Sequence, residues 1–100
     1  MKAAQRRPAR QRFGKHARSV MADRRWVLLP LCARAAWLQL TDIGDVMPEL
    51  RQPPAGRAVQ EDELCRLLGA DQAELQAALR PLLERDVMEK VGSGYRLKVF

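Results

Sequence analysis

Residues 60–100 read QEDELCRLLGADQAELQAALRPLLERDVMEKVGSGYRLKVF, and the order of elements in this stretch decides the fold. The pattern predicts a helix over Gln60–Leu68, because three acids at its start suit the positive end of a helix dipole and its leucines share one face. Gly69 ends this helix, since glycine enters the left-handed cap conformation at little cost. A second helix is predicted over Asp71–Arg85, with its first aspartate as the cap and Glu74 as the partner of a capping box.

After this helix pair the period changes to that of strands. Val87–Val91 and Tyr95–Phe100 are predicted as strands around the turn Gly92-Ser93-Gly94, because apolar and basic residues alternate in the second of them. Arg57–Val59 is predicted to add a short strand before the helix pair, and Leu31–Ile43 is predicted as a central core helix. The expected fold is therefore α+β, with three helices and a C-terminal β-hairpin.

The segments between these elements carry weaker signals. Asp45–Gly56 is predicted to be a loop, because it contains three prolines and a terminal glycine. Asp23–Leu29 is predicted to be extended and to place its tryptophan against the domain, and Trp37 is expected in the core. Cys32 and Cys65 lie within predicted helices, so we expect two reduced, mostly buried thiols.

Charge is distributed unevenly along the 100 residues. The net charge is +6, and seven basic residues precede the first acid, Asp23. Residues 23–100 contain the other eleven Lys and Arg residues and all twelve Asp and Glu residues, so this part of the chain is nearly neutral. The basic segment has too few apolar residues to offset the entropy cost of ordering it. We therefore predict a flexible basic arm over residues 1–22 and one folded domain over residues 23–100.

Several classes of protein are disfavoured by the composition. His16 is the single histidine and no CxxC or HxxxH spacing occurs, so we expect no metal site, no cofactor and no enzymatic activity. No apolar run is long enough for a transmembrane helix. Residues 24–33 resemble the core of a secretory signal, but Asp23, Pro30 and Arg34 interrupt that pattern. The Arg-rich start is typical of an organelle transit peptide, but the segment has few of the serines that such peptides carry. We therefore expect a cytoplasmic protein.

The order of apolar and turn positions over about residues 26–100 resembles winged-helix domains. It is similar to those of bacteriophage and plasmid replication-organiser proteins and, more loosely, to winged-helix transcription regulators. The segments that carry the resemblance are AAWLQL (35–40), ELCRLLG (63–69), ALRPLLER (78–85), VM (87–88) and GYRL (94–97). The resemblance implies that Asp71–Arg85 enters a DNA major groove and that residues 90–98 form the wing.

These features predict a small non-enzymatic DNA-binding protein that serves phage or mobile-element replication or transcription. The basic arm would contact phosphates, Gln72 and Gln76 would read adenine edges, and Arg80 would reach guanine or phosphate. The candidate nucleic-acid-binding residues are Arg6, Arg7, Arg10, Arg12, Lys15, Arg18, Gln72, Gln76, Arg80, Lys90, Arg96 and Lys98. The partner expected is double-stranded DNA, and the terminal strand or the first helix offers an edge or face through which a homodimer could form.

Acids on the second helix of the pair favour a different partner. Glu74 and Glu84 would face phosphates, and the wing tip Gly92-Ser93-Gly94 carries no base. The alternative function is therefore a winged-helix protein-interaction module, or an adaptor for RNA or ribosomes, in which the basic arm binds an acidic partner.

Overall fold

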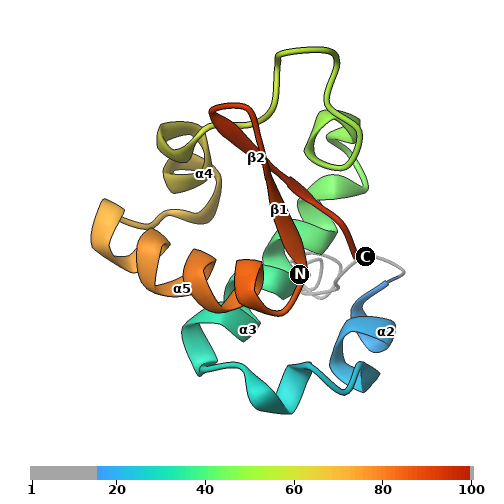
Figure 1. Ribbon diagram of the computed structural model, residues 1–100. Coiled ribbons are helices and arrows are strands. Elements are labelled where there is room, and N and C mark those ends of the chain that lie inside the picture. The colour runs from blue at the N-terminus through green and yellow to red at the C-terminus, as the bar shows by residue number, and fades with distance from the viewer. Residues whose placement is uncertain (1–15, 100) are drawn as a thin grey trace, which may run out of the picture.

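The computed structural model describes residues 16–99, which form four α-helices, two 3₁₀ helices and one two-stranded antiparallel sheet (Figure 1). In chain order these are α2 (Ala17–Ala22), η2 (Trp26–Leu28), α3 (Leu31–Gly44), η3 (Pro48–Leu50), α4 (Glu61–Leu68), α5 (Gln72–Glu84), β1 (Met88–Val91) and β2 (Gly94–Leu97). The α+β class, the helix pair and the C-terminal hairpin agree with the prediction from the sequence.

The signals at the ends of α4 and α5 act as predicted. Gly69 closes α4 in the left-handed conformation with φ 65°. The Asp71 carboxylate accepts a hydrogen bond of 2.8 Å from the backbone N–H of Glu74, and the Glu74 side chain accepts one of 2.9 Å from the backbone N–H of Asp71. This reciprocal capping box fixes the start of α5. Pro81 lies inside α5.

The hairpin pairs Met88 with Leu97 and Val91 with Gly94, so Gly92 and Ser93 form a two-residue turn. The predicted turn of three residues was therefore one residue too long. The predicted third strand is reduced to one bridge, in which the backbone N–H of Tyr95 donates to the Val59 carbonyl at 2.8 Å. The sheet thus has two full strands and a single-residue contact along the outer side of β2.

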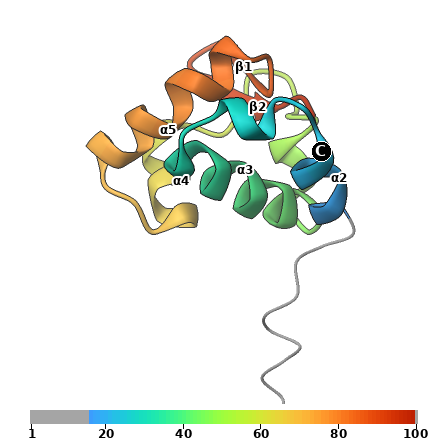
Figure 2. The same cartoon turned by 90° about the horizontal axis from the view of Figure 1, so that it is seen from below.

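The hydrophobic core lies between α3, α5 and the hairpin. Trp37 is fully buried at its centre, among residues that include Leu40, Leu79 and Leu97. The indole N–H of Trp37 donates to the Val99 carbonyl at 3.2 Å, which joins α3 to the end of the described chain. In both views α2 and α4 lie at opposite ends of this body (Figure 2). The core position predicted for Trp37 is confirmed.

Three local predictions were wrong. Residues 17–22 of the predicted flexible arm form helix α2, because Val20 is fully buried against the body. Residues 26–28 form a 3₁₀ turn rather than an extended segment, and the 45–56 loop contains η3, which buries Leu50. Residues 1–15, the rest of the predicted arm, lie outside the described residues.

The prediction of mostly buried cysteines was also partly wrong. Cys32 is exposed at the start of α3, and Cys65 on α4 is partly buried. Both are free thiols, so no disulfide joins them. Neighbouring leucines in the sequence indicate an apolar helix, but they do not place a given thiol on its inner face.

Candidate nucleic-acid interface

The exposed face of α5 carries three of the predicted site residues. Gln72, Gln76 and Arg80 recur every four residues, so they follow one side of the helix, and all three are exposed. The buried side carries Leu75, Ala78, Leu79 and Leu82. The sequence pattern therefore assigned the two sides of this helix correctly.

Gln72 is already hydrogen-bonded to an acid outside the set predicted from the sequence. The amide Nε2 of Gln72 donates to Glu61 Oε1. The Tyr95 hydroxyl donates to Glu61 Oε2 at 2.8 Å. Glu61 therefore joins the first turn of α4 to α5 and to β2.

The charge of Glu61 is stabilised by these donors. Its pKa is lowered, first by the hydrogen bond from Tyr95 and then by the side-chain amides of Gln76 and Gln72, with a smaller contribution from the positive charge of Lys90. The pKa of Tyr95 is raised, first by burial and then by the Glu61 carboxylate. At neutral pH the place where α4, α5 and the hairpin meet thus contains a carboxylate anion and a neutral phenol.

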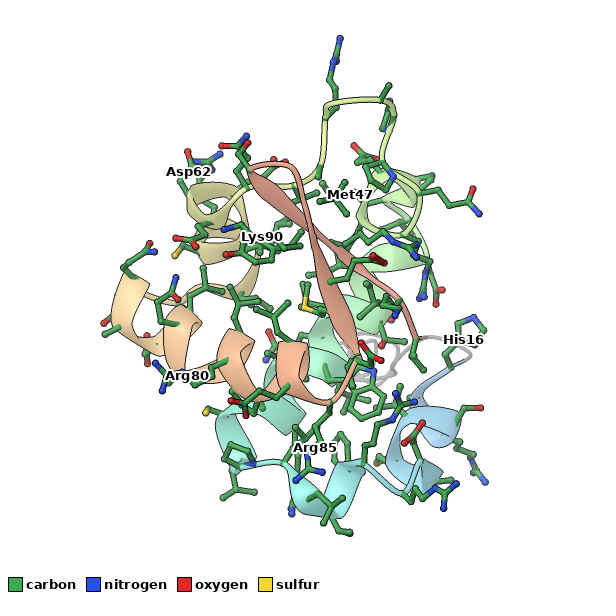
Figure 3. The ribbon with its side chains drawn as sticks, viewed as in Figure 1. His16, Met47, Asp62, Arg80, Arg85 and Lys90 are labelled. Carbon is green, nitrogen blue, oxygen red and sulfur yellow. The ribbon has the colours of Figure 1, made fainter. Side chains whose placement is uncertain are left out.

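The basic residues of the hairpin all lie close to acids or to backbone acceptors. Lys90 lies between the hairpin and α4, with its Nζ 6.0 Å from the centre of the Tyr95 ring (Figure 3). Arg96 forms a 3.0 Å ion pair with Glu89 and donates to the Arg51 carbonyl at 3.0 Å. Lys98 lies 3.5 Å from Asp86. Arg96 and Lys98 therefore stabilise the hairpin in this structure.

Two cations without an ion pair among residues 16–99, Arg24 and Arg85, lie near the C-terminal end of α5. They line one open hollow of about 580 Å³ together with Arg25 and the acids Asp23 and Asp86. Between them, Arg25 is held by Asp23 at 2.7 Å and donates to the Arg85 carbonyl at 3.2 Å. Figure 3 shows Arg80 and Arg85 along the same lower edge of α5.

Sequence reasoning missed this second group of cations. Arg24 and Arg25 precede an apolar run that imitates a secretion signal, and Arg85 ends a helix, so neither pattern indicates a shared surface. The fold brings them together because η2 packs beside the end of α5, a contact across sixty residues. Arg18, on α2, is exposed; Arg6, Arg7, Arg10, Arg12 and Lys15 lie outside the described residues.

Other kinds of site find little support in the described part of the chain. No group of three or more His, Cys, Asp or Glu side chains there is arranged to hold a metal ion. Within residues 16–99, no helix has both the length and the apolar character needed to cross a bilayer.

Comparison with known proteins gives no relative for this chain. No protein-family model matches it, and no curated protein and no solved structure is significantly similar to it.

Proposed function

We propose that this chain is a non-enzymatic, winged-helix DNA-binding protein with a role in replication or transcription. The observation that carries the proposal is the face of α5, where Gln72, Gln76 and Arg80 are exposed beside a C-terminal hairpin. The order α3, Val59 bridge, α4, α5 and hairpin is the one that the winged-helix resemblance implies. In this arrangement α5 enters the major groove and the hairpin lies over the adjacent backbone.

The binding free energy in this proposal comes mainly from cations outside the groove-facing part of α5. The start of α5 bears Glu74, and α4 begins with three acids, so this end of the body repels phosphates. Arg24 and Arg85 supply positive charge at the other end of α5, and seven basic residues between Lys2 and Arg18 add to it. Each phosphate that such residues neutralise releases counterions, so binding weakens as salt rises.

The test is the binding of a fluorescent duplex of about 20 base pairs by the full chain as salt is raised. Replacing the six basic residues of positions 2–15 by Gln is expected to weaken binding and to flatten its salt dependence. Arg80→Glu with Lys90→Glu is expected to weaken binding further, whereas Arg57→Glu, a charge reversal in the exposed loop before α4, is expected to have a smaller effect. Absence of binding by the unmodified chain at low salt would overturn the proposal.

A second candidate function is a protein-interaction module, and one observation favours it. Val27, Leu28 and Leu31 are exposed to 70%, 55% and 77%, and they follow one another from η2 into α3. Adjacent exposed apolar side chains are typical of surfaces that contact another protein. Replacing these three residues by Ser should leave DNA binding unchanged if they serve only a protein partner, and should abolish capture of that partner.

A further inference from the structure

The carboxylate of Glu61 occupies the place where the proposed DNA-reading face meets the hairpin. One oxygen accepts from Gln72 on α5, and the other accepts from the Tyr95 hydroxyl on β2 at 2.8 Å. A single side chain of α4 thus holds the first of the two glutamines that α5 would use to contact bases.

The chemistry of this bond fixes the direction in which the Gln72 amide faces. An ionised carboxylate only accepts hydrogen bonds, so the NH₂ group of Gln72 points toward Glu61. Only its carbonyl oxygen is then left for another donor. The Cys65 thiol approaches the Gln72 carbonyl at 3.6 Å, which agrees with this orientation and leaves one lone pair of that oxygen available.

We propose that Glu61 is a specificity-determining residue, which makes Gln72 present a hydrogen-bond acceptor rather than a donor–acceptor pair to DNA. Free glutamine pairs with adenine through one donor and one acceptor. A glutamine held by Glu61 favours bases that offer an amino group in the major groove, adenine N6 or cytosine N4, without distinguishing adenine by its N7. The proposal rests on the DNA-binding function proposed above.

The negative charge of Glu61 adds a second effect at the same place. Lys90 is the nearest cation of the hairpin, and its charge is partly offset by this carboxylate. A carboxylate facing the DNA disfavours phosphate contacts that do not depend on sequence. Glu61 therefore lowers general affinity for DNA while it restricts which bases are read.

The experiment measures binding by the full chain to a pool of duplexes with a randomised centre, followed by sequencing of the bound fraction. Glu61→Ala, which removes both acceptor oxygens, is compared with Asp62→Ala, which removes the same charge from the same turn of α4. Asp62 accepts from the backbone N–H of Glu63 and lies 3.8 Å from Arg66, so its hydrogen bond and its ion pair both stay within α4. Thermal unfolding of both variants establishes that each remains folded.

A distinct result is expected for each variant. Glu61→Ala releases the Gln72 amide, so the preferred base should shift toward adenine, and affinity for the new best site should rise by about tenfold relative to Asp62→Ala. Tyr95→Phe removes a donor to Glu61 but leaves the bond from Gln72, so it should keep the preference of the unmodified chain.

Three results would overturn the inference, and they are distinguishable. Equal affinity changes in Glu61→Ala and Asp62→Ala, with an unaltered base preference, would show that Glu61 acts only through charge. If Tyr95→Phe shifted the preference as Glu61→Ala does, the effect would be assigned to the position of the hairpin. Failure of every variant and of the unmodified chain to bind at low salt would remove the proposed function together with this inference.

Discussion

Gly94 lies directly against the backbone of Ala58: a Cβ atom at Gly94 would be 2.6 Å from the Ala58 carbonyl oxygen. It would also be 2.7 Å from the Val59 carbonyl oxygen, which accepts the hydrogen bond from the Tyr95 N–H. This close approach lets the segment before α4 contact the hairpin through a single bridge.

Gly94→Ala should therefore destabilise the protein, because backbone atoms must move to admit the methyl group. We expect a loss of about 1–3 kcal/mol in the free energy of unfolding, measured by urea denaturation. Ser93→Ala is the control, since this exposed residue loses only its hydrogen bond with Gln60. Equal stabilities of the two variants would show that the hairpin does not need this close approach.

Local signals at the helix pair could be read from the sequence, whereas long-range packing could not. Gly69, Asp71 and Glu74 act within one turn of their own positions, so residue type alone predicts their conformations. Val20 and Leu50 have apolar neighbours that are exposed, Met21 and Val46, so only the body that Val20 and Leu50 pack against makes them core residues. The same reason explains why the sequence did not predict α2 and η3.

The capping box provides a second stability prediction. Asp71→Ala removes the side-chain acceptor from the backbone N–H of Glu74, so we expect a loss of about 1 kcal/mol in the free energy of unfolding. Asp71→Asn should restore most of this loss, because asparagine caps helices equally well. Failure of the asparagine variant to recover stability would mean that the negative charge, and not the hydrogen bond, is what matters.

Trp37 should be the residue whose truncation costs most stability. Trp37→Ala removes a fully buried side chain, for which we expect about 3–5 kcal/mol. Trp37→Phe keeps most of the packing but loses the bond to the Val99 carbonyl, for which we expect about 1 kcal/mol. Val27→Ala is an exposed control and should change stability by less than about 0.5 kcal/mol. A ranking in which Val27→Ala costs more than Trp37→Ala would contradict the described core.

The ion pair between Asp23 and Arg25 predicts that the free energy of unfolding depends on pH in the acid range. The side-chain hydrogen bond from Arg25 lowers the pKa of Asp23 from 3.8 to about 2. Because the pKa is lower in the folded state, this pair stabilises the fold above about pH 4, and its contribution is lost as pH falls from 3.8 to about 2.

An NMR titration of the Asp23 carboxyl carbon measures this pKa directly, and acid unfolding of Asp23→Asn measures its effect. The variant should show a weaker dependence of stability on pH within that window. A titration midpoint close to 3.8 in the folded protein would contradict the ion pair.

The arginines at the C-terminal end of α5 give a prediction about the salt dependence of DNA binding. If Arg24 and Arg85 bind phosphates, replacing both by Gln should reduce the slope of log Kobs against log salt by about 0.9 for each phosphate that is no longer neutralised. Arg57→Gln removes an equally exposed charge and should leave the slope unchanged. An unaltered slope in the double variant would assign phosphate binding to other residues.

The candidate site could be predicted from the sequence only in part. The four-residue spacing of Gln72, Gln76 and Arg80 placed them correctly on an exposed face. The acids that pair with the predicted cations, Glu89 for Arg96 and Asp86 for Lys98, come from strand register and from the turn after α5. Such ion-pair partners depend on the tertiary arrangement of the chain. The spacing of residues within one helix or strand does not specify that arrangement.

The two-residue turn at Gly92-Ser93 also determines which side of the hairpin each later residue occupies. Successive strand residues alternate between faces, so one residue inserted at the turn would exchange the positions of Tyr95 and Arg96. The phenol would then leave Glu61, and the guanidinium would leave Glu89 and the Arg51 carbonyl. Loop length is therefore constrained more tightly than loop composition: the tip should accept many residues in place of Ser93, yet a single insertion would detach the hairpin from α4 and from η3 together.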